Sequence, residues 1–264
     1  MSMNSLLRRS HRLLSGIPGV PFLLRHVSRM ERDTLVILAL TAGGFYLFLK
    51  IADEVIEGET RTLDERILLA LRVPGDLATP IGPRWLVESM RDLTALGGTT
   101  VLTLMTLAVI CFLLMVRKHH TAILVTVSVA GGALISSLLK WGISRPRPDL
   151  VPHGMEVYSQ SFPSGHSMMS AVVYLTLGAV LARTQASLRV KTFLFGIAIA
   201  LTVVVGISRL YLGVHWPTDV LGGWTLGAAW AALCWLVMLY LQSKGEVEPE
   251  EPAPAEETSA GSRG

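Results

Sequence analysis

Long apolar stretches, separated by short polar connections, dominate the chain. A helix that crosses a bilayer needs about 20 mainly apolar residues. Six stretches approach or reach this length and are too uniform for a soluble core, so we predict an all-α fold: a polytopic membrane helix bundle with six transmembrane helices. The predicted spans are Thr34 to Ile51, Gly97 to Val116, Thr121 to Leu139, Ser167 to Ala182, Thr192 to Ile207 and Val220 to Leu241.

The connection after the first span predicts a short helix at the membrane surface. Thr62-Leu63-Asp64-Glu65 matches a capping box, in which a Ser or Thr and a Glu three residues later bond the first backbone N–H groups of a helix. Apolar residues follow at 67–71, and Pro74 ends the segment. A place beside the lipid entrance would suit such an interfacial helix.

The two ends of the chain differ in composition from the apolar centre. Residues 1–32 are rich in Arg and lack the continuous apolar region of a signal peptide, which predicts a basic cytoplasmic leader, either amphipathic on the inner leaflet or unstructured. Residues 33–244 form the predicted membrane domain. Residues 245–264, rich in Pro and Glu, predict a disordered tail. Cys111 and Cys234 lie within apolar spans and are interpreted as small core residues.

Positive charge beside the spans predicts the orientation, because cytoplasmic loops carry an excess of Lys and Arg. With six spans, the leader, Arg117 with Lys118, and the 183–191 connection all fall on one side. We therefore expect an inner-membrane protein with both termini in the cytoplasm and the opposite face directed outward, to the periplasm where one exists.

Three polar clusters interrupt the apolar pattern, and alternation of the spans places all of them on the outward face. Charges beside membrane helices are costly and usually functional, so one site is expected to contain the clusters. They comprise Lys140 and Arg147 after the third span, Pro163 to His166 before the fourth, and the 208–219 segment between the fifth and sixth, which holds Ser208, Arg209, His215 and Asp219.

The cationic members suit a phosphate group. Arg offers a planar fork of donors and Lys a point charge to a multiply charged oxyanion. Ser164 and Gly165 stand just before a predicted helix, where free backbone N–H groups bind anions. By itself this segment would more often be an ordinary helix start; beside Lys140, Arg147 and Arg209 it predicts a phosphate cradle.

The two histidines suggest a division of labour. Asp219 follows His215 by four positions and could fix its tautomer, leaving the other ring nitrogen free to attack phosphorus. His166 could protonate the departing oxygen. Alone, Asp219 would be read as a helix cap and His215 as an interfacial side chain. No carboxylate or cysteine cluster has metal-ligand spacing, so neither a metal nor another cofactor is expected.

Three segments carry a family resemblance: KWGISRPRP at 140–148, PSGH at 163–166 and SRLYLGVHWPTD at 208–219. Their order and spacing resemble the type 2 phosphatidic acid phosphatases, whose superfamily includes lipid diphosphate phosphatases and vanadium haloperoxidases. The resemblance implies that His215 forms a phosphohistidine, that Asp219 orients it and that His166 is the general acid. It also implies phosphate binding by Lys140, Arg147, Ser164, Gly165 and Arg209, with no metal. Arg145 is not a fixed position and could meet an outer phosphate or lipid headgroups.

The sequence thus predicts an integral-membrane phosphatase for a lipid phosphate or diphosphate. Undecaprenyl diphosphate is slightly preferred, and phosphatidylglycerol phosphate and phosphatidate are compatible. A lipid phosphotransferase with the same site and a non-enzymatic anion transporter are the alternatives; clusters confined to one face speak against the transporter. The expected partners are the lipid substrate and the bilayer, with no nucleic acid, and the oligomeric state is left open.

Overall fold

The computed structural model describes residues 32–153 and 159–244. Nearly all of the predicted leader, 1–32, and the whole predicted tail, 245–264, lie outside the described residues. The long helices are α3 (Arg32–Glu57), α6 (Thr99–Met115), α7 (His119–Gly142), α8 (Gly165–Arg183), α9 (Leu188–Tyr211) and α10 (Pro217–Ser243).

Each predicted span corresponds to one of these helices, and the predicted helical membrane bundle is confirmed. Among the described residues, five helices are long and apolar enough to cross a membrane. The sixth, α6, is shorter and follows α5 (Arg84–Ala95) at a 45° bend, so the two form a sixth span only if the bent pair is taken together.

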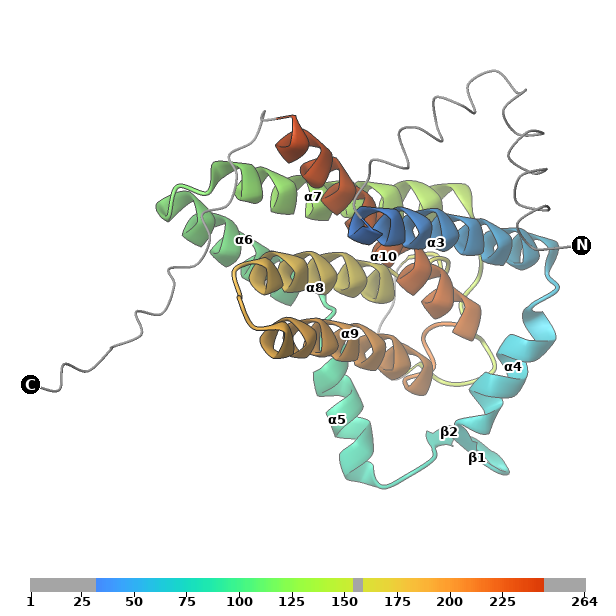
Figure 1. Cartoon of the computed structure of the whole chain (residues 1–264). Coiled ribbons are helices and arrows are strands. Elements are labelled where there is room, and N and C mark those ends of the chain that lie inside the picture. The colour runs from blue at the N-terminus through green and yellow to red at the C-terminus, as the bar shows by residue number, and fades with distance from the viewer. Residues whose placement is uncertain (1–31, 154–158, 245–264) are drawn as a thin grey trace, which may run out of the picture.

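Helix α8 lies at the centre of the bundle, where it packs against α6, α7, α9 and α10, while α3 packs along α10 (Figure 1). The end of α7, the start of α8, the end of α9 and the start of α10 meet at one end of the bundle, on the right in Figure 1. All three polar clusters therefore gather at this end, as the alternation of spans predicts.

Two glycines bring α10 close to the start of α8. A Cβ at Gly223 would lie 2.8 Å from the Ser164 carbonyl oxygen, and one at Gly227 would lie 2.5 Å from that of Met168. Only glycine permits this approach. The close packing lets the Ser164 N–H donate to the Asp219 carbonyl oxygen at 3.0 Å, which ties two of the predicted motifs together.

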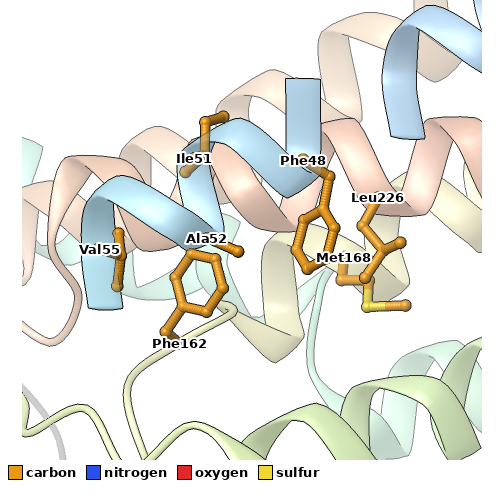
Figure 2. Close-up of a cluster of buried hydrophobic side chains, with 7 residues drawn as sticks. All are labelled: Phe48, Ile51, Ala52, Val55, Phe162, Met168 and Leu226. Atoms are coloured by element: carbon orange, nitrogen blue, oxygen red, sulfur yellow. The ribbon is translucent and has the colours of Figure 1, made fainter. Parts of the chain in front are cut away.

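An apolar cluster anchors the loop that leads into α8. Phe162 is fully buried and stacks on Phe48 of α3, with ring centroids 5.9 Å apart (Figure 2). Its ring also rests on the backbone of α10, since a Cβ at Gly222 would lie 2.7 Å from Phe162 Cε2. Burial of this aromatic side chain fixes the chain one residue before Pro163, at the start of the predicted phosphate cradle.

The first connection contains the predicted short helix, but its predicted capping box is wrong. Helix α4 (Arg61–Ala70) begins before Thr62, with Thr60 at its N-cap and no side-chain cap bond. Asp64 instead turns inward and accepts a bond from the Thr218 N–H, because the buried start of α10 also needs an acceptor there. An unpredicted antiparallel hairpin, β1 (Arg72–Val73) and β2 (Asp76–Pro80), follows.

Candidate active site

A cavity of about 470 Å³ opens where the polar ends of α7, α8, α9 and α10 meet. Two predicted site residues, Ser164 and Asp219, do not line it; both are fully buried behind its wall. The other predicted site residues line the cavity: Lys140, Arg147, Gly165, His166, Arg209 and His215.

His215 is held by contacts on both ring nitrogens. Its Nδ1 lies 3.3 Å from Asp219 Oδ2, and its Nε2 lies 3.1 Å from an Arg147 guanidinium nitrogen. A guanidinium can only donate, so Nε2 accepts and Nδ1 carries the proton that points toward Asp219. Ser161 Oγ lies 3.4 Å from the same Nδ1 and also donates to Asp219 Oδ2.

The local sequence explains how His215 and Asp219 come together. Gly213 turns the chain after α9 with a positive φ of 74°, and a Cβ there would lie 2.6 Å from an Arg72 nitrogen. Pro217 then starts α10, where its missing N–H costs nothing. Asp219 accepts from the Trp216 N–H at 2.9 Å. The same carboxylate therefore both caps the start of α10 and faces the imidazole.

Burial sets the charge state of the histidine. His215 is 1% exposed, and burial, with the neighbouring charges of Arg147 and Arg209, lowers its pKa to about 3 despite the opposing effect of Asp219. The imidazole is therefore neutral at physiological pH. A neutral ring keeps the lone pair on Nε2 that a nucleophile requires.

The cationic wall is held by the loop between α7 and α8. Lys140 Nζ donates to the Gln160 carbonyl oxygen at 2.8 Å, and Arg147 Nε donates to the Ser159 carbonyl oxygen at 2.7 Å. Burial lowers the pKa of Arg147, but a guanidinium keeps its proton. Arg209 is 2% exposed and donates to Thr94 Oγ1 at 3.0 Å, which connects α9 to the end of α5.

Ser164 and His166 have different surroundings at the start of α8. Ser164 is the N-cap, and its hydroxyl accepts from Ser167 Oγ at 3.0 Å. The hydroxyl thus serves the helix start, behind the cavity wall. His166, two positions later and in the first turn of α8, is partly exposed and lines the cavity.

Sequence reasoning missed several partners of Asp219. Arg145 donates to Asp219 Oδ1 at 2.6 Å and to Asp64 Oδ2 at 2.6 Å, and its side chain is 12% exposed. Neither role considered for Arg145, an outer phosphate or lipid headgroups, fits this buried pairing. Spacing could not reveal the contact, because Asp64 lies far away in the sequence within what resembled an ordinary capping motif.

The cavity has an apolar wall that extends along the membrane helices. Leu102 of α6, Val129 of α7 and Met169 of α8 line it beyond the cationic end. No α4 residue lines the cavity, so the expected place of α4 beside a lipid entrance is not supported. Within 32–153 and 159–244, no group of three His, Cys, Asp or Glu side chains could hold a metal ion.

A membrane bundle with a neutral histidine facing several cations has the features of a lipid phosphate phosphatase. Comparison with known proteins agrees. The PAP2 superfamily model matches residues 121–243. Phosphatidylglycerophosphatase B of Bacillus subtilis is 36% identical over 184 residues, which cover 69% of this chain and 87% of that protein. An undecaprenyl-diphosphatase of Sulfolobus acidocaldarius is 34% identical over 82 residues, 31% of this chain and 32% of that protein.

The fold agrees as well. A crystal structure of a transmembrane PAP2-type phosphatidylglycerolphosphate phosphatase from Bacillus subtilis superposes with a TM-score of 0.68 at 31% identity, covering 80% of this chain and 98% of that one. The chain therefore belongs to the PAP2 superfamily. It is a membrane lipid phosphatase of that superfamily.

Proposed function

We propose that this protein hydrolyses phosphatidylglycerol phosphate through a phosphohistidine on His215. One observation carries the proposal. The neutral, fully buried His215 presents Nε2 to a cavity lined by Lys140, Arg147 and Arg209, while its Nδ1 faces Asp219. This arrangement supports a nucleophilic role for His215, beside three cations that suit a phosphate dianion.

In the first step, His215 Nε2 attacks phosphorus and the bond to the lipid oxygen breaks. Asp219 accepts the Nδ1 hydrogen bond, which stabilises the positive charge that develops on the ring. With the substrate phosphate bound, its negative charge would favour a protonated His166 ring, which gives its proton to the departing lipid alkoxide. In the second step, the now neutral His166 takes a proton from water, the water oxygen attacks phosphorus, and inorganic phosphate leaves with His215 restored.

The loop contacts of the cations suggest how substrate is received. Lys140 and Arg147 bond carbonyl oxygens of Gln160 and Ser159. Phosphate oxygens carry more negative charge than carbonyls and make stronger bonds to cations. Substrate phosphate would therefore replace the loop oxygens and draw Arg147 away from His215 Nε2. That movement would free the nucleophile only when substrate is bound.

The choice of lipid rests on the relatives. The protein named phosphatidylglycerophosphatase B matches over 87% of its length, whereas the undecaprenyl-diphosphatase matches over 32%. We therefore place phosphatidylglycerol phosphate first and undecaprenyl diphosphate second, in reverse of the slight preference drawn from sequence. The apolar cavity wall along α6, α7 and α8 offers a surface for the tail of either lipid.

A substrate panel tests the proposal. Protein purified in detergent is given phosphatidylglycerol phosphate, undecaprenyl diphosphate and phosphatidate at equal mole fraction in the micelle, and released phosphate is measured. We expect the fastest release from phosphatidylglycerol phosphate. If no phosphate is released from any of the three lipids, the proposal is overturned. That result would favour the anion-transporter alternative, which needs no catalysis. Addition of a second lipid alcohol, followed by mass spectrometry, separates hydrolysis from transfer.

We also propose that the cavity faces outward. Asp149 lies in the loop at the cavity end of the bundle and Lys118 in the turn between α6 and α7; both are exposed. In a background with Cys111 and Cys234 replaced by Ser, Asp149→Cys should react with an impermeant thiol reagent in intact cells and Lys118→Cys should not. The reverse labelling pattern would place the cavity on the cytoplasmic face.

A further inference from the structure

A second buried carboxylate lies behind the nucleophile, outside the cavity. Asp64 of α4 is 0% exposed, and its two oxygens accept from the Thr218 N–H at 3.0 Å, from Thr218 Oγ1 at 2.7 Å and from an Arg145 guanidinium nitrogen at 2.6 Å. A buried charge is tolerated only when it is paired and hydrogen-bonded. These contacts meet that condition and join α4 to the start of α10.

Arg145 connects the two buried carboxylates. One guanidinium nitrogen donates to Asp64 Oδ2, and the other donates to Asp219 Oδ1, each at 2.6 Å. The second nitrogen also donates to Thr218 Oγ1 at 2.8 Å, and the guanidinium lies 5.7 Å from the centre of the Trp216 ring. The planar fork of Arg suits this bridge, which a Lys ammonium could not reproduce in the same plane.

The bridge fixes the Asp219 carboxylate from its far side. Oδ1 is occupied by Arg145, while Oδ2 is left for Ser161, the Trp216 N–H and His215 Nδ1. With both oxygens held, the carboxylate cannot rotate away from the imidazole. Orientation of this kind is what a triad acid supplies to its histidine.

The charges also balance. Arg145 alone would neutralise Asp219 and reduce its ability to stabilise a positively charged, phosphorylated His215 ring. Asp64 supplies a second negative charge, so Asp64, Arg145 and Asp219 together carry a formal net charge of about −1 beside the histidine. Electrostatic effects are strong here because all three groups are shielded from water.

We propose that Asp64 and Arg145 are positioning residues for catalysis, acting through Asp219 on His215; this rests on the proposed nucleophilic role of His215. Neither residue lines the cavity, so neither is a phosphate ligand. Asp64 belongs to the connection after the first span and lies 154 positions before Thr218. The pair therefore links this connection to the last motif, which contains His215 and Asp219. The role of α4 is therefore to hold the nucleophile, away from the lipid path.

The test is a charge-balance cycle on a water-soluble aryl phosphate. Asp64→Asn changes the net charge behind His215 from −1 to 0, and Arg145→Gln changes it to −2, whereas the double variant restores −1. We expect each single variant to lower kcat about tenfold to a hundredfold with KM changed less than about twofold, because only a positioning effect is lost. The double variant should be more active than either single variant.

Controls separate this role from plain stability. Glu65→Gln removes a neighbouring acid of the same helix, one that pairs with Arg61 at the surface at 2.8 Å, and should leave kcat unchanged. If Asp64→Asn fails to reach the membrane, Arg145→Lys keeps the charge, loses the fork, and should still lower kcat.

Three outcomes would overturn the proposal: kcat within twofold of wild type for folded Asp64→Asn, a rise in KM alone, or a double variant no more active than the more active single variant. Failure of the pair is distinguishable from failure of the proposed function. If His215→Ala keeps activity in the same assay, the phosphohistidine mechanism itself is wrong.

Discussion

The two histidines of the cavity stand in contrasting surroundings. His215 is 1% exposed and has contacts at both ring nitrogens, from Asp219, Ser161 and Arg147. His166 is partly exposed, and its side chain has no hydrogen-bond partner within the described ranges. The difference suits the two proposed roles. A nucleophile gains from a fixed position and tautomer, whereas a proton donor must follow the leaving oxygen of each substrate.

The same contrast extends to the groups around them. The half around His215 is built from buried side chains that bond to one another, such as Ser161 and Asp219. The cationic half bonds to loop carbonyls of Ser159 and Gln160, which phosphate oxygens would replace under the proposed mechanism. Preorganisation is therefore concentrated on the proposed nucleophile, where the proposed mechanism develops positive charge in the transition state.

Removal of the nucleophile should have the largest effect. His215→Ala is expected to reduce phosphate release by about a thousandfold or more on every substrate, since a missing nucleophile costs at least several kcal/mol of barrier. His153→Ala is the matched control: its ring contacts the Pro148 carbonyl oxygen at 2.6 Å outside the cavity, and activity should persist. More than about a tenth of wild-type activity in His215→Ala would contradict the assignment.

Removal of His166 should have an effect that depends on the substrate. A lipid phosphomonoester releases a poor alkoxide, so His166→Ala should slow it by about a hundredfold or more, whereas an aryl phosphate or a diphosphate should be much less impaired. All substrates are assayed in one detergent, because micelle partitioning could imitate a chemical effect. A uniform loss would show that His166 binds phosphate or supports the fold, and the contrast between the histidines would disappear.

Loosening the nucleophile half should have an intermediate effect. Ser161→Ala removes the hydroxyl that donates to Asp219 Oδ2 and leaves the carboxylate with fewer bonds. A bond to a charged group contributes about 1.5 to 3 kcal/mol, so we expect kcat to fall by about tenfold or more and the thermal midpoint to drop. Equal kinetics for Ser161→Ala and wild type would mean that the buried bonds around Asp219 do not position it.

The sequence predicted what depends on local pattern. The spans followed from hydropathy, and the gathering of Lys140, Arg147, Arg209 and His215 followed from the alternation of spans. It did not predict the pairing of Asp64 with Thr218, because a contact over 154 positions leaves no local periodicity. It also did not predict that the Ser164 hydroxyl lies behind the wall, since close packing of α10 at Gly223 buries it.

The smallest effect is expected from metal removal, and it tests whether protein cations alone serve the phosphate half. Lys140, Arg147 and Arg209 line the cavity, and chelation by EDTA should leave the rate unchanged. Vanadate should inhibit, because a five-coordinate oxyanion resembles the transition state these cations would stabilise. His215→Ala should weaken vanadate inhibition of the residual rate, because the imidazole that would bind the vanadium atom is lost. A rate abolished by EDTA and restored by a divalent ion would show that these three cations need a metal ion to serve the phosphate. The two halves of the site would then differ more strongly, because the half around His215 is built from protein side chains alone.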